Sequence, residues 1–157
     1  MINKNNNFWS ALNVEQFFDK DSAHEVFYYE TQVSETDLDV FGHVNNSNYL
    51  RYFERARWHF INAKNYGLDR IQREKKGPVL LEVNLQFRRE LKAQDHVLIL
   101  SQCQKVEAKF MTLKQVIIRE DLKLSAEAKF LIGFFDLETR KLIEPSVDWL
   151  DSVGYRS

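Results

Sequence analysis

One long segment, residues 47–66, has the spacing of a helix with large apolar side chains on more than one side. Apolar residues recur three and four positions apart, and others widen that face: Tyr49, Tyr52, Phe53, Ala56 and Phe60, then Leu50, Trp58 and Ile61. Such a helix has to be covered on most sides by other elements. Asn46 or Ser47 suits its start, and Gly67 suits a left-handed end.

The segments around this helix have the alternation of β-strands. A strand is expected at residues 25–33, and the Gly77-Pro78 pair is expected to break the chain before a half-exposed strand at 81–87. Three further strands are expected at residues 96–104, 109–119 and 123–137, and the polar turns between them favour antiparallel pairing. The pattern predicts an α+β fold in which an antiparallel sheet curls around one central helix, with a last helical turn within 145–153.

Composition limits the class of protein and its partners. A chain of 157 residues with 44% hydrophobic and 13% aromatic residues is expected to form one domain with a real core. The net charge of −1 gives no reason to expect a nucleic-acid partner, and no apolar run is long enough for a membrane span. Cys103 is the single cysteine, so no disulfide can form within the chain, which favours a reducing, cytoplasmic location. We expect Cys103 itself to be a small core residue.

The first 24 residues are expected to be an extension of the domain at 25–157. Residues 1–7 read as a polar tail, and residues 8–20 have loose helical spacing. We expect a short amphipathic helix there that packs on the body of the domain, and a small role in binding a partner or membrane is the alternative.

The run from Asp37 to Tyr49 carries the chemistry. Two carboxylates, Asp37 and Asp39, come just after the first strand, and a glycine turn and a polar step then lead into the long helix. The first N–H groups of a helix lack partners within the helix, and its dipole favours negative charge there. A carboxylate beside such a helix start is a general arrangement for attack on a carbonyl group.

This run resembles the hotdog-fold acyl-CoA thioesterases of the 4-hydroxybenzoyl-CoA thioesterase type, and most closely their long-chain acyl-CoA branch. The residues that carry the resemblance are Asp39, the 42–46 turn, Tyr49 and the helix run 52–58, with weaker matches at 85–89 and Asp95. It covers about residues 25–140. The resemblance implies a five-stranded antiparallel sheet wrapped around the helix, at least a dimer with sites at the subunit interface, and thioester hydrolysis without a metal.

By the same resemblance, Asp39 matches the catalytic aspartate of the family. Such a carboxylate attacks the thioester carbon directly or activates a water molecule, and the sequence leaves both routes open. The alternative is an aspartate that only stabilises the turn. The backbone N–H of Asn46 is expected to point at the carbonyl oxygen, and Gly42 provides the freedom that the sharp turn needs.

Other polar residues of the run have weaker roles. His43 has no serine or cysteine nearby to activate, so it is expected to stabilise the turn or contact the edge of the substrate. Asn45 either positions water or caps the helix. Asp37 either shares the site of Asp39 or orders the loop.

Residues outside the turn complete the predicted site. Glu54 is the rival carboxylate, because some hotdog enzymes place theirs on the central helix, but an ion-pair network with neighbouring arginines is the simpler interpretation. Tyr49 is expected along the acyl pocket or in the core. Arg88 and Arg89 are candidates for the phosphates of coenzyme A, and a solvated strand end is the alternative.

The sequence therefore predicts hydrolysis of acyl-CoA, with medium or long fatty acyl groups favoured by the aromatic content. An acyl carrier protein is the alternative carrier. A hydratase or dehydratase of 3-hydroxyacyl thioesters and a non-catalytic acyl-CoA-binding module are the rival functions. We expect a homodimer or homotetramer that needs no cofactor, since coenzyme A is part of the substrate.

Overall fold

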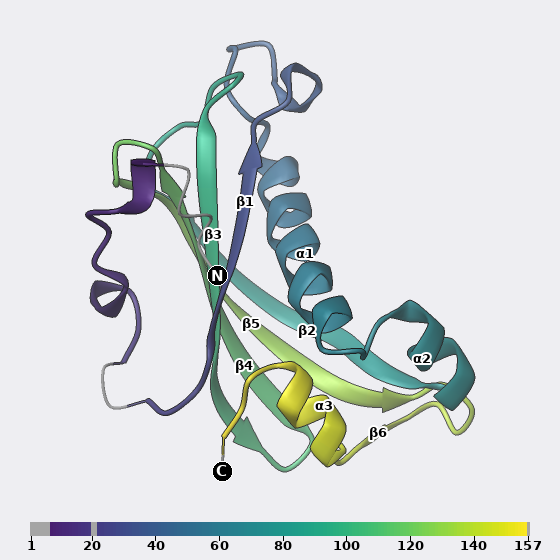
Figure 1. The fold of residues 1–157 in the computed structure, drawn as a ribbon. Coiled ribbons are helices and arrows are strands. Elements are labelled where there is room, and N and C mark those ends of the chain that lie inside the picture. The colour runs from purple at the N-terminus through teal and green to yellow at the C-terminus, as the bar shows by residue number, and fades with distance from the viewer. Residues whose placement is uncertain (1–6, 20–21, 157) are drawn as a thin grey trace.

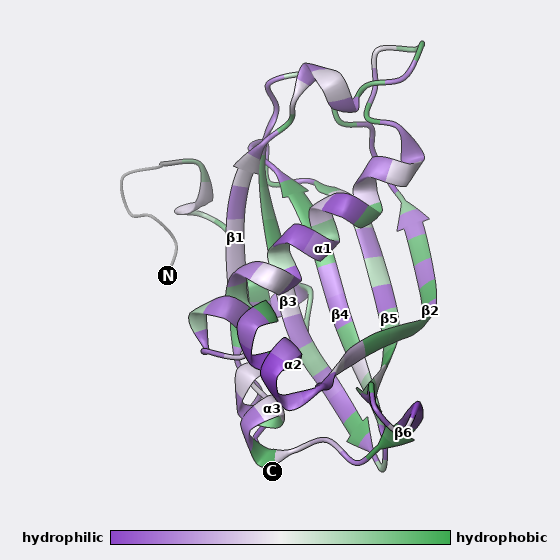
Figure 2. Ribbon diagram, turned by 90° about the vertical axis from the view of Figure 1, so that its right-hand side faces the viewer, coloured by the Kyte–Doolittle hydropathy of each residue, from purple (hydrophilic) through white to green (hydrophobic). Residues whose placement is uncertain are grey.

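The computed structural model describes residues 7–19 and 22–156. Its sheet has the strand order β1-β3-β4-β5-β2 with antiparallel pairing throughout, and a short β6 pairs with the end of β5 (Figures 1 and 2). The predicted hotdog fold is confirmed. The strands are β1 Val26–Gln32, β2 Lys76–Phe87, β3 His96–Glu107, β4 Phe110–Arg119, β5 Leu124–Asp136 and β6 Lys141–Ile143.

Helix α1, Asn46–Ala63, lies along the inner face of this curved sheet (Figure 2). Six of the apolar residues are buried as the spacing predicts, whereas Leu50 is exposed; the buried ones are Tyr49, Tyr52, Phe53, Ala56, Phe60 and Ile61. The Phe60 ring stacks on Phe27 of β1 at 4.3 Å, and Phe53 meets Phe130 of β5 edge-on at 5.6 Å. The long aromatic face therefore joins both halves of the sheet in one core.

The end of α1 differs from the prediction. Asn65, with φ 60°, takes the left-handed position, and its N–H donates to the Asn62 carbonyl. Gly67 has φ −78° and instead begins a second helix, α2 Leu68–Glu74, which the sequence did not predict. The Asn62 side chain lies close to Gly67, and a Cβ there would be 2.0 Å from Asn62 Oδ1, so a larger residue would require this side chain to move.

The Gly77-Pro78 pair does not break the chain but lies inside β2. Pro78 pairs with Phe134 of β5 in the register of the sheet. Because β2 is the last strand in the order, one side of it has no neighbouring strand among the described residues, and a proline without an N–H is tolerated on such an edge. The strand is longer than the alternation predicts for this reason.

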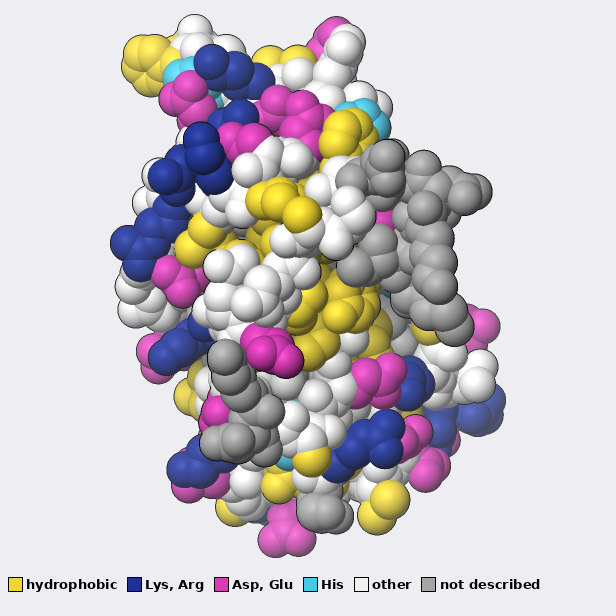
Figure 3. Space-filling view, turned by 60° about the vertical axis from the view of Figure 1, so that its left-hand side comes forward, with side chains coloured by type: hydrophobic (Ala, Val, Ile, Leu, Met, Phe, Trp, Pro, Cys, Tyr) yellow, Lys and Arg dark blue, Asp and Glu magenta, His cyan; other side chains and the backbone are white. Residues whose placement is uncertain are grey.

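The described part of the N-terminal segment covers the outer face of the sheet, away from α1 (Figure 1). It holds two short 3-10 turns, Asn7–Trp9 and Val14–Gln16, where we expected one helix. Seen from the left-hand side of Figure 1, hydrophobic side chains gather in the middle of the molecule, with charged side chains around them (Figure 3).

At the other end of the sheet, the predicted last turn forms helix α3, Val147–Ser152, whose Trp149 is buried. Among the described residues, no helix has both the length and the apolar character needed to cross a membrane.

Candidate active site

The loop between β1 and α1 folds Asp39 into a tight turn. Leu38 and Val44 form an isolated antiparallel bridge that closes the loop. Within it, the Asp39 N–H donates to the His43 carbonyl at 2.8 Å, and the Phe41 N–H donates to Asp39 Oδ1 at 2.9 Å. The carboxylate is thereby held by one oxygen, while Oδ2 has no hydrogen bond within the described residues.

Gly42 supplies the backbone conformation that the turn needs. Its φ is +76°, in the region that favours glycine, and its N–H donates to the Asp39 carbonyl at 3.0 Å. A Cβ at Gly42 would meet nothing within 4 Å, so conformation rather than space selects glycine here. Gly42 thus acts through the conformation of the loop, as the sequence predicts for a sharp turn.

The first turn of α1 leaves one N–H group open. The Asn45 N–H donates to the Asp37 carbonyl, the Ser47 N–H to Asn45 Oδ1, and the Asn48 N–H to the Asn45 carbonyl, each at 2.9 Å. In the described part of the chain, the Asn46 N–H has no acceptor. It is the donor that the sequence predicts for the developing oxyanion, at the positive end of the helix dipole.

A hollow of about 340 Å³ brings most of the predicted site residues together. It is open to solvent, and its walls come from the 39–49 segment and from the end of β2. The carboxylate that the sequence singles out therefore shares one hollow with the helix start and both candidate arginines. The lining residues are Asp39, His43, Val44, Asn46, Tyr49, Phe87, Arg88, Arg89 and Glu90.

Contacts behind the hollow explain why these two distant segments meet. The Val44 N–H donates to the Leu91 carbonyl at 2.9 Å, which ties the loop to the chain leaving β2. Tyr49 is buried and packs edge-on against Phe87 at 5.0 Å. Burial raises the pKa of Tyr49, and its hydrogen bonds with Ser125 and the Leu91 backbone oppose that rise. Tyr49 thus forms a neutral back wall.

The sequence did not predict the most buried polar contact near the site. Asp37 is 6% exposed and accepts a hydrogen bond from the Tyr52 hydroxyl. Its carbonyl accepts from the Asn45 N–H and from Asn48 Nδ2, each at 2.9 Å. Asp37 therefore orders the loop and does not line the hollow with Asp39. A tyrosine at a buried helix position was the available signal, because its hydroxyl needs a partner.

The charged residues of the hollow are partly engaged with one another. His43 Nε2 lies 3.4 Å from the Glu90 carboxylate, which was not among the predicted residues. Arg88 donates to Glu127 Oε1 at 2.7 Å and also to Gln86. Within residues 7–19 and 22–156, the Arg89 side chain donates only to the Leu124 carbonyl, at 3.4 Å. Of the two arginines, Arg89 is thus less constrained.

Three predicted residues do not line the hollow: Gly42, Asn45 and Glu54. Asn45 is the helix cap, with its Oδ1 bound to both the N–H and the hydroxyl of Ser47, at 2.9 and 2.7 Å. Glu54 lies eight residues further along α1 than Asn46, or roughly 12 Å along the helix axis. It lines a different cavity.

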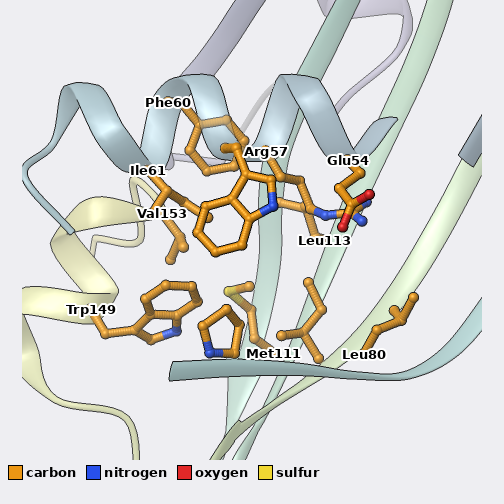
Figure 4. Close-up of a pocket in the computed structure, with 12 residues that line it drawn as sticks. Glu54, Arg57, Phe60, Ile61, Leu80, Met111, Leu113, Trp149 and Val153 are labelled. Carbon is orange, nitrogen blue, oxygen red and sulfur yellow. The ribbon is translucent and has the colours of Figure 1, made fainter. Parts of the chain in front are cut away.

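That second cavity, about 110 Å³, is mainly apolar and lies between α1, β2, β4 and α3 (Figure 4). Glu54 and Arg57 stand at one end of it, and Pro78, Leu80 and Trp149 are among its apolar walls. Arg57 donates to Gln115 Oε1 at 2.9 Å and Arg51 to Asn48 Oδ1 at 3.4 Å. Within the described chain neither arginine lies within 4.0 Å of the Glu54 carboxylate, so the ion-pair network expected for Glu54 is not formed. Burial lowers the pKa of Arg57 to about 10.

Among residues 7–19 and 22–156, no group of His, Cys, Asp and Glu side chains is arranged to hold a metal ion. The candidate chemistry of the hollow is carried by a carboxylate and a backbone donor.

Comparison with known proteins identifies the family. Residues 33–153 match the model of the thioesterase-like superfamily. The long-chain acyl-CoA thioesterase FadM of Escherichia coli (strain K12) is 32% identical over 107 residues, which cover 68% of this chain and 80% of that protein.

Solved structures agree on the fold. The probable thioesterase YbaW from Escherichia coli superimposes with a TM-score of 0.72 at 27% identity, covering 82% of this chain and 96% of that one. A 1,4-dihydroxy-2-naphthoyl-CoA thioesterase from Synechocystis superimposes with a TM-score of 0.76 over 82% of this chain and 96% of that one. At 21% identity, the second likeness shows the fold alone.

Proposed function

Since the chain belongs to the thioesterase-like superfamily, we propose that it hydrolyses acyl-CoA thioesters at the hollow beside Asp39. One observation carries the proposal: the Asp39 carboxylate and the unpaired Asn46 N–H line the same hollow. A reacting carbonyl between them meets a negative group at carbon and a donor at oxygen, which is what acyl transfer requires.

The proposed reaction adds water across the carbon–sulfur bond and releases a carboxylic acid and the thiol of coenzyme A. In one route Asp39 Oδ2 attacks the carbonyl carbon and displaces the thiolate, and water then cleaves the mixed anhydride to release the acid and restore Asp39. In the other, Asp39 Oδ2 takes a proton from the water that attacks the carbonyl carbon, and the carbon–sulfur bond breaks. In both routes the proton given up by water is the one that the thiolate finally receives. As charge develops on the carbonyl oxygen, the Asn46 N–H and the helix dipole stabilise it. No metal or cofactor is needed in this scheme.

We further propose that two copies pair through their β2 edges. β2 has a free edge in the described chain and exposes Leu80 and Leu81, which are 46% and 44% exposed. Antiparallel pairing about the middle of β2 would set the Phe87 end of one copy beside the Pro78 end of the other. The apolar cavity at Pro78 would then adjoin the partner's hollow and receive the acyl chain.

Substrate length follows from that arrangement. A cavity of about 110 Å³ with Trp149 and Leu80 on its walls, joined to the hollow, suits a medium or long fatty acyl group. Arg89, with Arg88 beside it, is proposed to hold the phosphates of coenzyme A at the rim. A cytoplasmic location is proposed from the single, buried cysteine.

Release of free thiol from a panel of acyl-CoAs, from short to long chains, tests the proposal. The wild-type protein is expected to turn over the longer members best. Asp39→Asn keeps the shape of the side chain but removes its charge, and turnover is expected to fall at least about 1000-fold. Glu54→Gln is the matched control on α1, and its turnover is expected to stay within a few-fold of wild type.

Other outcomes point to the rival functions. If Asp39→Asn retained turnover and Glu54→Gln lost it, the reactive carboxylate would be Glu54 on α1 and not Asp39. Loss of water from a 3-hydroxyacyl-CoA without thiol release would indicate a dehydratase. Tight binding of every acyl-CoA without any turnover would indicate a binding module.

A further inference from the structure

The neighbouring strands β3 and β4, both inside the sheet, carry apolar residues on both faces. On the inner face, Val97 and Ile99 of β3 belong to the core around α1. On the outer face, four aliphatic side chains are no more than 1% exposed: Leu98, Leu100, Val116 and Ile118. An antiparallel sheet with one solvated face would alternate apolar with polar residues instead. This outer face therefore needs a cover.

Residues 7–19 provide the cover. Trp9 and Phe18, 2% and 8% exposed, pack in one cluster with the four outer aliphatic side chains. Lys114 of β4 donates to the Phe17 carbonyl at 2.6 Å, and Phe8 stacks on His96 at the start of β3 with ring centroids 5.4 Å apart. The segment is thus attached by two buried aromatic anchors, Trp9 and Phe18, and by one lysine, while Phe8 is 40% exposed and stacks at its edge.

The segment 7–19 lies outside both the sheet and the part of the chain that matches the superfamily. It pairs with no strand of the sheet, and it precedes residue 33, where the match to the superfamily begins. Without it, a flat aliphatic surface on β3 and β4 would face water. Contiguous apolar patches of this kind drive association, and the usual partner of an aliphatic sheet face is another sheet face about 10 Å away.

We infer that residues 7–19 form an intramolecular cover that keeps a second copy of the chain off the outer face of β3 and β4. A second copy is the fitting partner because it carries the same flat aliphatic surface and the chain has a net charge of only −1. That charge gives no attraction to an anionic membrane. The inference does not depend on the proposed reaction, which takes place at the opposite, inner side of the sheet.

Substitution of the anchors in the full chain tests the inference. In Trp9→Ser/Phe18→Ser the cover loses its apolar contacts, and sedimentation velocity is expected to give about twice the parental mass, increasing with protein concentration. The control is Phe8→Ser, whose side chain is already 40% exposed and which is expected to keep the parental mass. Adding Leu100→Lys to the double variant places a charge on the uncovered face and is expected to restore the parental mass.

Circular dichroism establishes whether each variant is folded. A folded double variant with the parental mass at all concentrations would overturn the inference, as would association that Leu100→Lys leaves unchanged. If the double variant unfolds, the single variant Phe18→Ser takes its place in the sedimentation experiment. A smaller, concentration-dependent increase in mass supports the cover, and no increase refutes it.

Discussion

The Tyr52 hydroxyl on α1 lies 2.5 Å from Asp37 Oδ2 in the loop that carries Asp39. This contact joins the central helix to the segment just before the reactive turn. Burial raises the pKa of Tyr52, and the Asp37 carboxylate raises it further, so the phenol stays protonated and donates. The position of Asp39 relative to the helix start therefore depends on the Tyr52 hydroxyl, a buried donor whose acceptor, Asp37, is two residues before Asp39 in the chain.

Removal of that donor should loosen the loop. Tyr52→Phe leaves the Asp37 carboxylate buried without its partner, and the free energy of unfolding is expected to fall by about 1–3 kcal/mol. The turnover number is expected to fall with little change in KM, since the acyl and phosphate contacts remain. Urea denaturation and steady-state kinetics measure both effects. Tyr28→Phe, on a half-buried tyrosine of β1, is the control, and equal losses in the two variants would contradict this role.

The open N–H at Asn46 can be removed without removing the helix. Proline is tolerated at the first position of a helix, and Asn45, with φ −58° and ψ 140°, already has the conformation that precedes proline. Asn46→Pro is expected to lower the turnover number roughly 100- to 1000-fold, as for loss of one oxyanion donor.

Asn46→Ala separates the backbone from the side chain. It keeps the N–H and is expected to retain turnover within a few-fold of wild type. Steady-state thiol release from both variants, with circular dichroism to confirm the fold, makes the comparison. Equal activity of the proline and alanine variants would exclude the backbone of Asn46 from the reaction.

Gly42 offers a test of backbone conformation alone. Because its added Cβ would meet nothing within 4 Å, Gly42→Ala should destabilise the protein only through the left-handed φ of 76°. A loss of about 1–2 kcal/mol in the free energy of unfolding is expected, and less for Gly42→Asn, since asparagine adopts this conformation more readily. Urea denaturation of the pair is the measurement. An asparagine variant less stable than the alanine variant would contradict this explanation.

Cys103 should be unreactive in the folded protein. Burial raises the pKa of its thiol to about 12, against an ordinary value of 9.0, so the thiolate is scarce at neutral pH. Native protein is expected to resist alkylation by iodoacetamide at pH 8, whereas protein in urea is labelled. Mass spectrometry counts the adducts. Fast labelling of the native chain would mean that β3 opens more readily than its burial suggests.

Much of the fold was predictable because it depends on side-chain period. The spacing of Tyr49, Phe53 and Phe60 predicts the buried face of α1, and the alternation in β2 to β5 predicts the sheet. The meeting of Asp39, Asn46, Tyr49 and the two arginines in one hollow also agrees with the predicted set, although their individual roles stay predictions.

The parts that escaped prediction depend on contacts between distant residues. Asp37 and Tyr52 are 15 positions apart, and their bond exists only because a 3-10 turn at Glu35–Asp37 directs the carboxylate inward. The left-handed end of α1 is at Asn65, and Gly67 instead precedes α2, a helix that the local spacing does not reveal. Pro78 fits inside β2 because that strand is at the edge, which its local sequence does not reveal.

Because β3 and β4 are covered on both faces, their amide hydrogens should also exchange slowly with solvent. Amide hydrogens in these strands are shielded by α1 on one side and by residues 7–19 on the other, so they should exchange with deuterium only when the whole chain unfolds. The turn at Asp39 lacks such shielding and should exchange through small local openings. The molecule would then combine a slowly exchanging centre with a fast-exchanging reactive loop, and the two rates could be changed independently.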